Sequence, residues 1–286
     1  MQADFVATVN SSRRRKITAN HSATHLMHAA LKQILGNHVV QKGSLVNEEH
    51  TRFDFAHFAK VSEEDIMNIE QLVNEKIREN IALDERRNVP IEEAKSMGAT
   101  ALFGEKYGDY VRVIIFDPAY SMELCGGTHV SATGEIGLFK IISESAVAAG
   151  VRRIEAITSI KAEEYINNQL RQLNTIKSEL KNPKDIVVRV KELLSENEIL
   201  QKQIESYVHE KAQRIKAELL KKVRLQNNIN VIAQKIDLAN ADAIKNISFE
   251  LRNQLPDSFI LLASESDGKA MLSLIISDQL VQSGKL

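Results

Sequence analysis

Apolar residues recur at helical spacing in several stretches of the chain, and three of these lie in the first hundred residues. The first stretch ends at Gly36, and Asn20 is its expected N-cap. A second stretch follows Ser62, an expected N-cap with Asp65 three residues later, and continues to Asn80. A short helix is expected over 91–97. These stretches predict amphipathic helices with one face in a core.

Alternating and β-branched runs lie between the predicted helices. The runs 39–46 and 51–55 predict a pair of strands joined through Asn47, Glu48 and Glu49. Four more strand-like runs follow at 81–89, 111–116, 137–143 and 151–159, and the chain opens on another at 5–9. This mixture predicts an α+β fold in which a sheet is covered by helices.

The character of the chain changes near residue 160. From there to about residue 225 glycine is absent, Pro183 is the only proline and charge is dense, which predicts two long helices broken at 181–185. Apolar positions step by three and four along both helices, as in a coiled-coil seam that includes Asn197. We expect an antiparallel helical hairpin. It either folds only on itself or serves as an arm that spaces two modules.

A small α+β module is predicted after the helices. Its expected elements are a strand at 230–236, a helix at 241–255, and a hairpin of 259–263 with 271–276 that turns at 266–268. The module reaches Leu286 with little predicted core, so we expect it to be truncated. The predicted division is therefore 1–159, 160–226 and 227–286.

Composition limits the classes of function. Lys and Arg number 37 and Asp and Glu 38, so the chain is not globally basic and any RNA contact must come from a local patch. Arg13, Arg14, Arg15 and Lys16 form such a patch just before the first predicted helix, although a run of charge is more often a solvated face. No run of about 20 apolar residues predicts a membrane span. With a single cysteine, a cytoplasmic location is the default expectation.

Two pairs of residues suggest a metal site. His21 and His25 are four residues apart and share one face of a predicted helix, and Cys125 lies four residues before His129. Imidazole and thiolate are ligands that Zn²⁺ prefers, and Cys125 has no other cysteine with which to form an internal disulfide. We therefore predict one zinc ion per chain, held by His21, His25, Cys125 and His129.

Simpler interpretations exist for these histidines. A histidine pair at this spacing is common on solvated helices. The second pair, Cys125 and His129, is what favours a metal site. His28 is expected to be a packing residue or to support the ligands, and we assign nothing to the remaining histidines, which are His38, His50, His57 and His209. A metalloprotease is disfavoured because the histidine pair encloses Ser22, Ala23 and Thr24, with no glutamate to act as base.

Four blocks of sequence, at 20–28, 40–44, 52–55 and 123–129, resemble the editing domain of bacterial alanyl-tRNA synthetases in order and spacing. The resemblance covers nearly the whole chain, since that family continues with a helical hairpin and a C-terminal module that meets tRNA and supports dimerisation. Nothing upstream matches the adenylate-forming domain, and the later glycine-rich portion is missing. We therefore expect a C-terminal fragment with editing but without aminoacylation activity.

The resemblance implies hydrolysis of seryl and glycyl esters of tRNA(Ala), whose acceptor end would be the partner, with a homodimer formed through the C-terminal region. An alanine pocket rejects glycine by only about 1–3 kcal/mol and excludes serine imperfectly, so an editing pocket must recognise the serine hydroxyl through polar contacts. Thr24 and Gln41 are the candidates for that recognition. The simpler interpretation of Gln41 is a strand surface residue, and that of Thr24 is a helix residue bonded to its own backbone.

Three further expectations concern the reaction and its rivals. The amides of Gly126 and Gly127 are expected to face the developing oxyanion, and the basic patch to steer the acceptor end. Arg52 and Asp54 lie on one face of a strand and are weaker candidates that would pair with each other. A freestanding trans-editing deacylase, or a non-catalytic RNA-binding or dimerising module stapled by zinc, are the alternatives.

Overall fold

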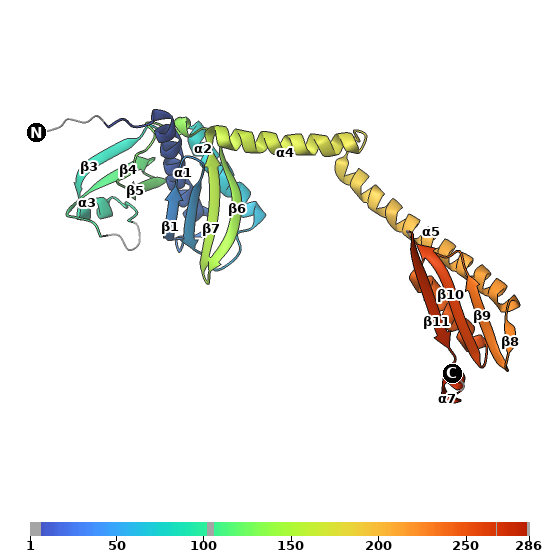
Figure 1. The fold of residues 1–286 in the computed structure, drawn as a ribbon. Coiled ribbons are helices and arrows are strands. Elements are labelled where there is room, and N and C mark those ends of the chain that lie inside the picture. Colours follow the sequence, from blue (N-terminus) through green and yellow to red (C-terminus); the bar gives the residue numbers. More distant parts are fainter. Residues whose placement is uncertain (1–6, 102–105, 267, 285–286) are drawn as a thin grey trace, which may run out of the picture. The chain divides into compact units, whose positions relative to one another are not determined.

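The computed structural model describes residues 7–101, 106–266 and 268–284, which form two compact units that divide between Ile176 and Lys177. Each unit mixes helices with sheets whose neighbouring strands are mostly antiparallel, so the predicted α+β class is confirmed (Figure 1). No helix in the described part of the chain is long and apolar enough to cross a membrane. The predicted division into three parts stays a prediction, as does the cytoplasmic location.

The first unit is built around two long helices. Helix α1 spans Ser11–Leu35 and α2 spans Glu63–Arg78, where Ser62 caps α2 by accepting the amide of Asp65 as predicted. The expected N-cap of α1 was wrong, because the helix begins ten residues earlier with Asn10 as its N-cap. Nothing in the intervening sequence breaks a helix. Asn20 is instead buried in the middle of α1, where its amide donates to Asn47 O at 2.8 Å.

Two sheets accompany these helices. The four-stranded sheet has the order β1-β2-β7-β6, with all its neighbours antiparallel. The three-stranded antiparallel sheet has the order β3-β4-β5. The strand bounds are β1 Gln41–Val46, β2 Thr51–Ala56, β3 Asp84–Pro90, β4 Tyr110–Phe116, β5 Ser121–Leu124, β6 Phe139–Ala148 and β7 Val151–Thr158.

The sequence predicted these strands except β5, which is only four residues long and does not alternate clearly. Two short helices, α3 (Ile91–Ser96) and the 3₁₀ turn η1 (Thr133–Ile136), complete the unit; α3 was predicted and η1 was not. In the opening run expected as a strand, residues 7–9 have no regular secondary structure, and residues 5 and 6 lie outside the described residues.

The core of the first unit lies between α1, α2 and the four-stranded sheet. Leu26, Met27 and Leu31 of α1 and Ile69 and Val73 of α2 are buried against Phe53 and Phe55 of β2. Burying a side chain of this size stabilises the fold by about 1.5–3 kcal/mol. This packing fixes α1 firmly, and the residues on its remaining face carry the polar chemistry described below.

Helices α4 (Ser159–Glu179) and α5 (Ile186–Lys221) are the two long helices that the sequence predicts. Most apolar seam residues of both helices are exposed in the structure, among them Leu170, Leu173, Leu200, Ile204 and Tyr207. Asn197 is exposed as well. Packing of the two helices as an antiparallel hairpin therefore stays a prediction.

The second unit contains a sheet of order β11-β10-β9-β8 and the helix α6 (Ala241–Gln254), followed by the short α7 (Asp278–Gln282). Its strands are β8 Arg224–Gln226, β9 Ile229–Lys235, β10 Ser258–Ser266 and β11 Lys269–Ile276. Strands β9 and β10 are parallel and joined through α6. The sequence missed β8 and α7, and the predicted turn at 266–268 includes residue 267, which lies outside the described residues.

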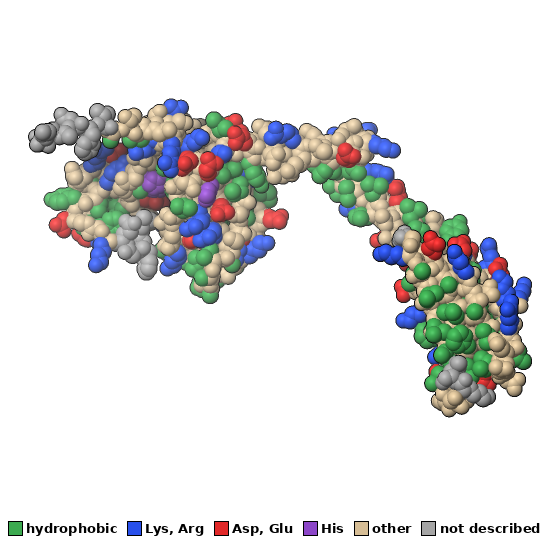
Figure 2. Space-filling model, in the orientation of Figure 1, with side chains coloured by type: hydrophobic (Ala, Val, Ile, Leu, Met, Phe, Trp, Pro, Cys, Tyr) green, Lys and Arg blue, Asp and Glu red, His purple; other side chains and the backbone are tan. Residues whose placement is uncertain are grey.

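The second unit has an apolar core of its own, in contrast to the little core expected from its sequence. Ile247 and Leu251 of α6 pack with Ile260 and Leu262 of β10, and α5 adds Leu219. The opposite face of the sheet is open, with Leu272 at 72% and Leu274 at 55% exposed. Figure 2 shows hydrophobic side chains gathered over β10 and β11. The predicted homodimer through this region stays a prediction.

Candidate metal centre

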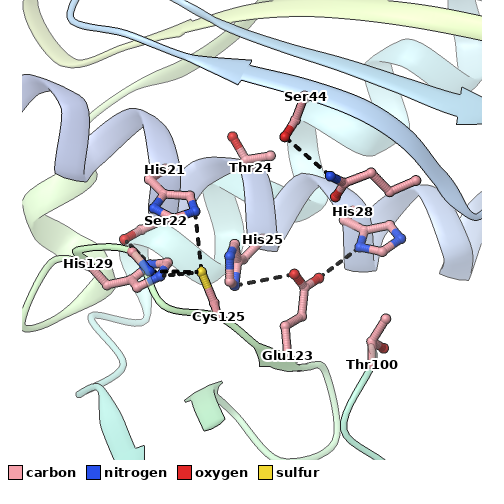
Figure 3. Close-up of polar contacts among 12 residues, drawn as sticks. His21, Ser22, Thr24, His25, His28, Ser44, Thr100, Glu123, Cys125 and His129 are labelled. Atoms are coloured by element: carbon pink, nitrogen blue, oxygen red, sulfur yellow. Dashed lines mark hydrogen bonds and ion pairs between the residues drawn. The ribbon is translucent and has the colours of Figure 1, made fainter. Parts of the chain in front are cut away.

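The two predicted ligand pairs meet in space. His21 and His25 point from α1 toward Cys125 and His129, which lie in the loop after β5 (Figure 3). The possible ligand atoms of all four residues lie within 4.8 Å of one another. The structure therefore brings together residues that are about a hundred positions apart in the sequence.

Distances within this cluster fit a tetrahedral ion. Cys125 Sγ lies 3.5 Å from His21 Nε2 and 3.4 Å from His129 Nε2. A tetrahedron with zinc–sulfur bonds of about 2.3 Å and zinc–nitrogen bonds of about 2.0–2.1 Å has a sulfur–nitrogen edge of about 3.6 Å. With three imidazoles and one thiolate, the residues present suit zinc in both donor chemistry and spacing.

A buried carboxylate supports the cluster from behind. Glu123 Oε1 lies 2.8 Å from His28 Nδ1, and Oε2 lies 3.4 Å from Nδ1 of the candidate ligand His25. All three side chains are almost completely buried. Because Nδ1 of His25 faces the carboxylate, its Nε2 remains for a metal, which is the usual arrangement of a histidine ligand. His28 contacts Glu123 and not a candidate ligand, so its expected role in packing or in supporting the ligands stays a prediction, whereas Glu123 was missed.

His129 is oriented by a serine of α1. Ser22 Oγ lies 3.1 Å from His129 Nδ1 and accepts the amide of Val130 at 3.1 Å. This contact leaves Nε2 of His129 directed at Cys125 Sγ. Ser22 is completely buried, one residue after a candidate ligand, and no sequence pattern distinguishes it from the other residues of the helix.

Burial keeps the imidazoles neutral. It lowers the pKa of His21 to about 4, with the neighbouring His25 adding to the effect. Burial, with His25 and His21 nearby, lowers the pKa of His129 to about 2, and burial also lowers the pKa of His25. Burial raises the pKa of Glu123, but the Nδ1 groups of His25 and His28 that face the carboxylate, together with the charge of Lys32, outweigh it and lower the pKa. Neutral imidazole is the form that binds a metal ion.

The two glycines of the loop have different surroundings. A Cβ atom on Gly127 would lie 2.2 Å from Cε1 of His21, so only glycine fits there, whereas a Cβ on Gly126 would meet open space. The Gly127 amide donates to Cys125 Sγ at 3.4 Å. The expected role of this amide in an oxyanion site therefore needs correction, because its hydrogen is directed at the sulfur.

Thr24 is buried beside the cluster on α1, with both of its contacts inside the protein. Its hydroxyl donates to Asn20 O at 2.8 Å and lies 2.6 Å from Thr51 Oγ1. The bond to its own helix is the simpler interpretation weighed above. Since the one hydroxyl hydrogen is used, Thr24 Oγ1 can offer a substrate only an acceptor.

Gln41 opens β1 at a half-buried position. Its Nε2 donates to Ser44 Oγ at 3.2 Å. Ser44 and Thr24 are both drawn near the histidine cluster in Figure 3. Gln41 keeps its place as a candidate for substrate recognition.

The basic patch lies within α1 and not before it. Arg13, Arg14, Arg15 and Lys16 are all exposed in the first turns of the helix, and Arg13 pairs with Glu48 at 3.0 Å. Arg15 and Lys16 line a groove of about 380 Å³ with the start of α4. The patch is therefore open to solvent and accessible to a polyanion.

Two other expectations changed. Asp54 does not pair with Arg52 but with Arg153 of β7, through two bonds of 2.7 and 2.8 Å, because the adjacent strand places Arg153 directly opposite. His38 and His57, which lack any sequence spacing, form a hydrogen bond of 2.9 Å. Both contacts depend on strand register, which single-residue spacing does not show.

Part of this chain matches a known family model, and nearly all of it is similar to named proteins. Residues 111–155 match the family model described as the threonyl and alanyl tRNA synthetase second additional domain. The alanine–tRNA ligase of Cytophaga hutchinsonii is 54% identical over 98% of this chain, that of Bacteroides fragilis 49% over 99%, and that of Porphyromonas gingivalis 44% over 98%. The chain spans about a third of each relative, 32% of its length.

Proposed function

We propose that this chain has an editing activity, the hydrolysis of the ester in mischarged seryl- and glycyl-tRNA(Ala). Almost the whole chain is similar to a segment that makes up about a third of the length of alanine–tRNA ligases. The observation that carries this proposal is the cluster of His21, His25, Cys125 and His129. Cys125 and His129 lie inside the matched second additional domain, and the two histidines of α1 complete the set.

In this proposal His21, His25, Cys125 and His129 hold one zinc ion. To act as a Lewis acid on the ester, the ion would have to exchange one of these ligands or accept a fifth. Four protein ligands fill a tetrahedron, so the residues around the ion must select and orient the substrate. Ser22 and Glu123 hold the imidazoles of His129 and His25 in the orientation that this role requires.

Recognition of serine is assigned to Thr24 and Gln41. A serine hydroxyl can donate to an acceptor, whereas alanine has no group that would do so. Thr24 Oγ1 has its hydrogen engaged by Asn20 O, and Gln41 has its Nε2 engaged by Ser44, so each has an oxygen that can accept. A buried acceptor left unpaired by alanine is costly, which favours the seryl ester.

Binding of the tRNA acceptor end is assigned to Arg13, Arg14, Arg15 and Lys16. These exposed cations would contact phosphates without reading sequence, so deacylation should slow as salt is added. Replacing Arg14, Arg15 and Lys16 together by alanine should raise KM and flatten the salt dependence. An unchanged KM and salt response would remove the patch from the proposal.

The test is deacylation of Ser-tRNA(Ala), Gly-tRNA(Ala) and Ala-tRNA(Ala) by this chain, with Cys125→Ala beside the parent. The matched control is His209→Ala, which removes a histidine from α5 in the second unit. We expect the seryl and glycyl esters to be lost faster than the alanyl ester, Cys125→Ala to abolish the difference, and His209→Ala to keep it. Equal rates for all three esters with the parent chain would contradict the proposal.

A second candidate is a non-catalytic RNA-binding module that zinc staples together. It is favoured by one observation, namely that four protein ligands leave a tetrahedral ion no open position. This candidate predicts zinc and tRNA binding by a chain that deacylates nothing. A freestanding trans-editing deacylase is less favoured, because the matched ligases align with this chain through α4, α5 and the second unit.

A further inference from the structure

Arg112 lies beside the metal centre, on a strand that supplies no ligand. It belongs to β4, where alternate residues face opposite sides of the sheet. Ile114 and Phe116 share its side and pack into the core of the first unit, whereas Val111 and Val113 pack into a separate cluster on the other side. Arg112 is thus the charged member of the face that looks toward α1.

The backbone and side chain of Arg112 both hold the loop that contains Cys125. Its carbonyl accepts the Cys125 amide at 3.1 Å, and its Nη1 donates to Cys125 O at 2.9 Å and also to Gly127 O. One side chain therefore binds the carbonyl groups at both ends of the Cys125–Gly127 turn. The same turn directs the Gly127 amide at Cys125 Sγ.

The guanidinium is itself fixed from the other side. Its Nε donates to Glu85 Oε1 at 2.8 Å, and Glu85 also accepts from Arg87. Arg112 is only 22% exposed, whereas the Arg87 side chain is 74% exposed. Glu85 therefore orients the planar fork of Arg112 while leaving Nη1 for the loop carbonyls.

We propose that Arg112 is a positioning residue of the metal centre. It fixes the Cys125–Gly127 turn so that Cys125 Sγ faces His21 and His129 at the spacing that a tetrahedral ion needs. The inference rests on the proposed metal centre and is independent of the editing reaction. It explains why an arginine suits this position, since a planar fork can span two carbonyls that a lysine ammonium would meet less rigidly.

The experiment measures the metal and not only the reaction. The full chain is prepared as Arg112→Met, Arg112→Lys and Arg87→Met, the last removing the other arginine that contacts Glu85. Zinc affinity is determined by competition with a chromophoric chelator, and the cobalt-loaded proteins are compared by their thiolate-to-cobalt absorption. Circular dichroism and thermal melting confirm that each variant is folded.

We expect Arg112→Met to weaken zinc binding by about 10–100-fold, the usual range for groups that support a ligand, and to alter the cobalt spectrum. Arg112→Lys should lose less, and Arg87→Met should match the parent chain. Parent-like affinity and spectra in both Arg112 variants would overturn the inference, as would an equal loss in Arg87→Met. If Arg112→Met does not fold, Arg112→Lys decides between these outcomes.

Deacylation by the same proteins separates the two proposals. A parent chain that binds zinc but hydrolyses no ester would contradict the editing function, while the affinities of the Arg112 variants would still decide the positioning role. A parent chain that binds no zinc would overturn the positioning role.

Discussion

The two units of this chain bury different kinds of side chain. In the first unit the buried polar residues include two histidines, a glutamate, an asparagine and four threonines, and each of these has a partner on another element. In the second unit the buried polar side chains among the described residues are four serines, namely Ser248, Ser258, Ser264 and Ser277. Ser248 and Ser264 donate to backbone carbonyls, Ser277 accepts a backbone amide, and the hydroxyl of Ser258 has no hydrogen-bond partner among the described residues.

The difference shows what each unit has to specify. An apolar core tolerates substitution when volume and pattern are kept, because dispersion and burial have little directional preference. A buried polar network has to satisfy each group with one particular partner. In the first unit such a network surrounds His21, His25, Cys125 and His129, which form the candidate metal site. The second unit carries no comparable cluster among its described residues.

Removing the metal should have the largest effect, and it should lower the Tm of the first unit only. At free zinc about a thousand times its Kd, the ion stabilises a folded unit by about 4 kcal/mol, and a shift of roughly 10 °C in the Tm of the first unit is expected on chelation. The second unit should melt unchanged. Calorimetry with and without chelator measures both transitions, and an equal shift of the two would contradict a metal confined to the first unit.

Leu262→Ala should reverse the pattern. Leu262 is completely buried in the second unit, so its loss should reduce the free energy of unfolding of that unit by about 2–5 kcal/mol. Zinc affinity should remain that of the parent chain, because no ligand is touched. Urea unfolding and a zinc titration measure the two quantities. Weakened zinc binding would show that the units depend on each other.

Gly127→Ala and Gly126→Ala test whether close packing at one position of the loop affects zinc binding. The added methyl group on Gly127 would overlap the His21 ring, so we expect a cost of about 1–3 kcal/mol and weakened zinc binding. The neighbouring Gly126→Ala adds the same methyl group in open space and should bind zinc normally. Two variants with the same affinity would mean that close packing at Gly127 does not shape the site.

Asp54→Asn tests a smaller, pH-dependent term in the first unit. The bonds from Arg153 lower the pKa of Asp54. A carboxyl with a lowered folded pKa stabilises the protein above its unfolded pKa of about 3.9, and that contribution is lost as the pH falls through the folded value. The variant should therefore be less stable than the parent at pH 7, with the gap closing below about pH 4. Unfolding curves from pH 7 to pH 3 measure the gap, and a constant gap would argue against the ion pair.

Leu272→Gln should have the smallest effect. The side chain is 72% exposed on the open face of β11, so we expect a change within about 0.5 kcal/mol in the second unit and none in zinc binding. Urea unfolding of the variant beside the parent measures the change. A loss of more than 1 kcal/mol would mean that this face is covered in solution.

Local features of the sequence were sufficient for most elements and for the ligands. The Ser62 cap, the end of α1 at Gly36 and the period of α2 and α6 depend on neighbours within a few residues, as does the spacing of His21 from His25 and of Cys125 from His129. Each follows from the geometry of a helix turn or a short loop. The start of α1 was wrong for the same reason, because Asn20 has the composition of a cap but is buried by partners distant in sequence.

The α+β class and the local spacing of the candidate metal ligands therefore follow from the sequence alone. The groups that surround these ligands are apparent only from the tertiary structure. Glu123 contacts His25, Ser22 contacts His129, the Gly127 amide donates to Cys125, and Arg112 donates to the carbonyl of Cys125. Glu123, Ser22 and Arg112 are unremarkable in the linear chain. Glu123 and Ser22 contact positions about a hundred residues away, and Arg112 reaches the loop because β4 pairs with β5. No local periodicity encodes these contacts.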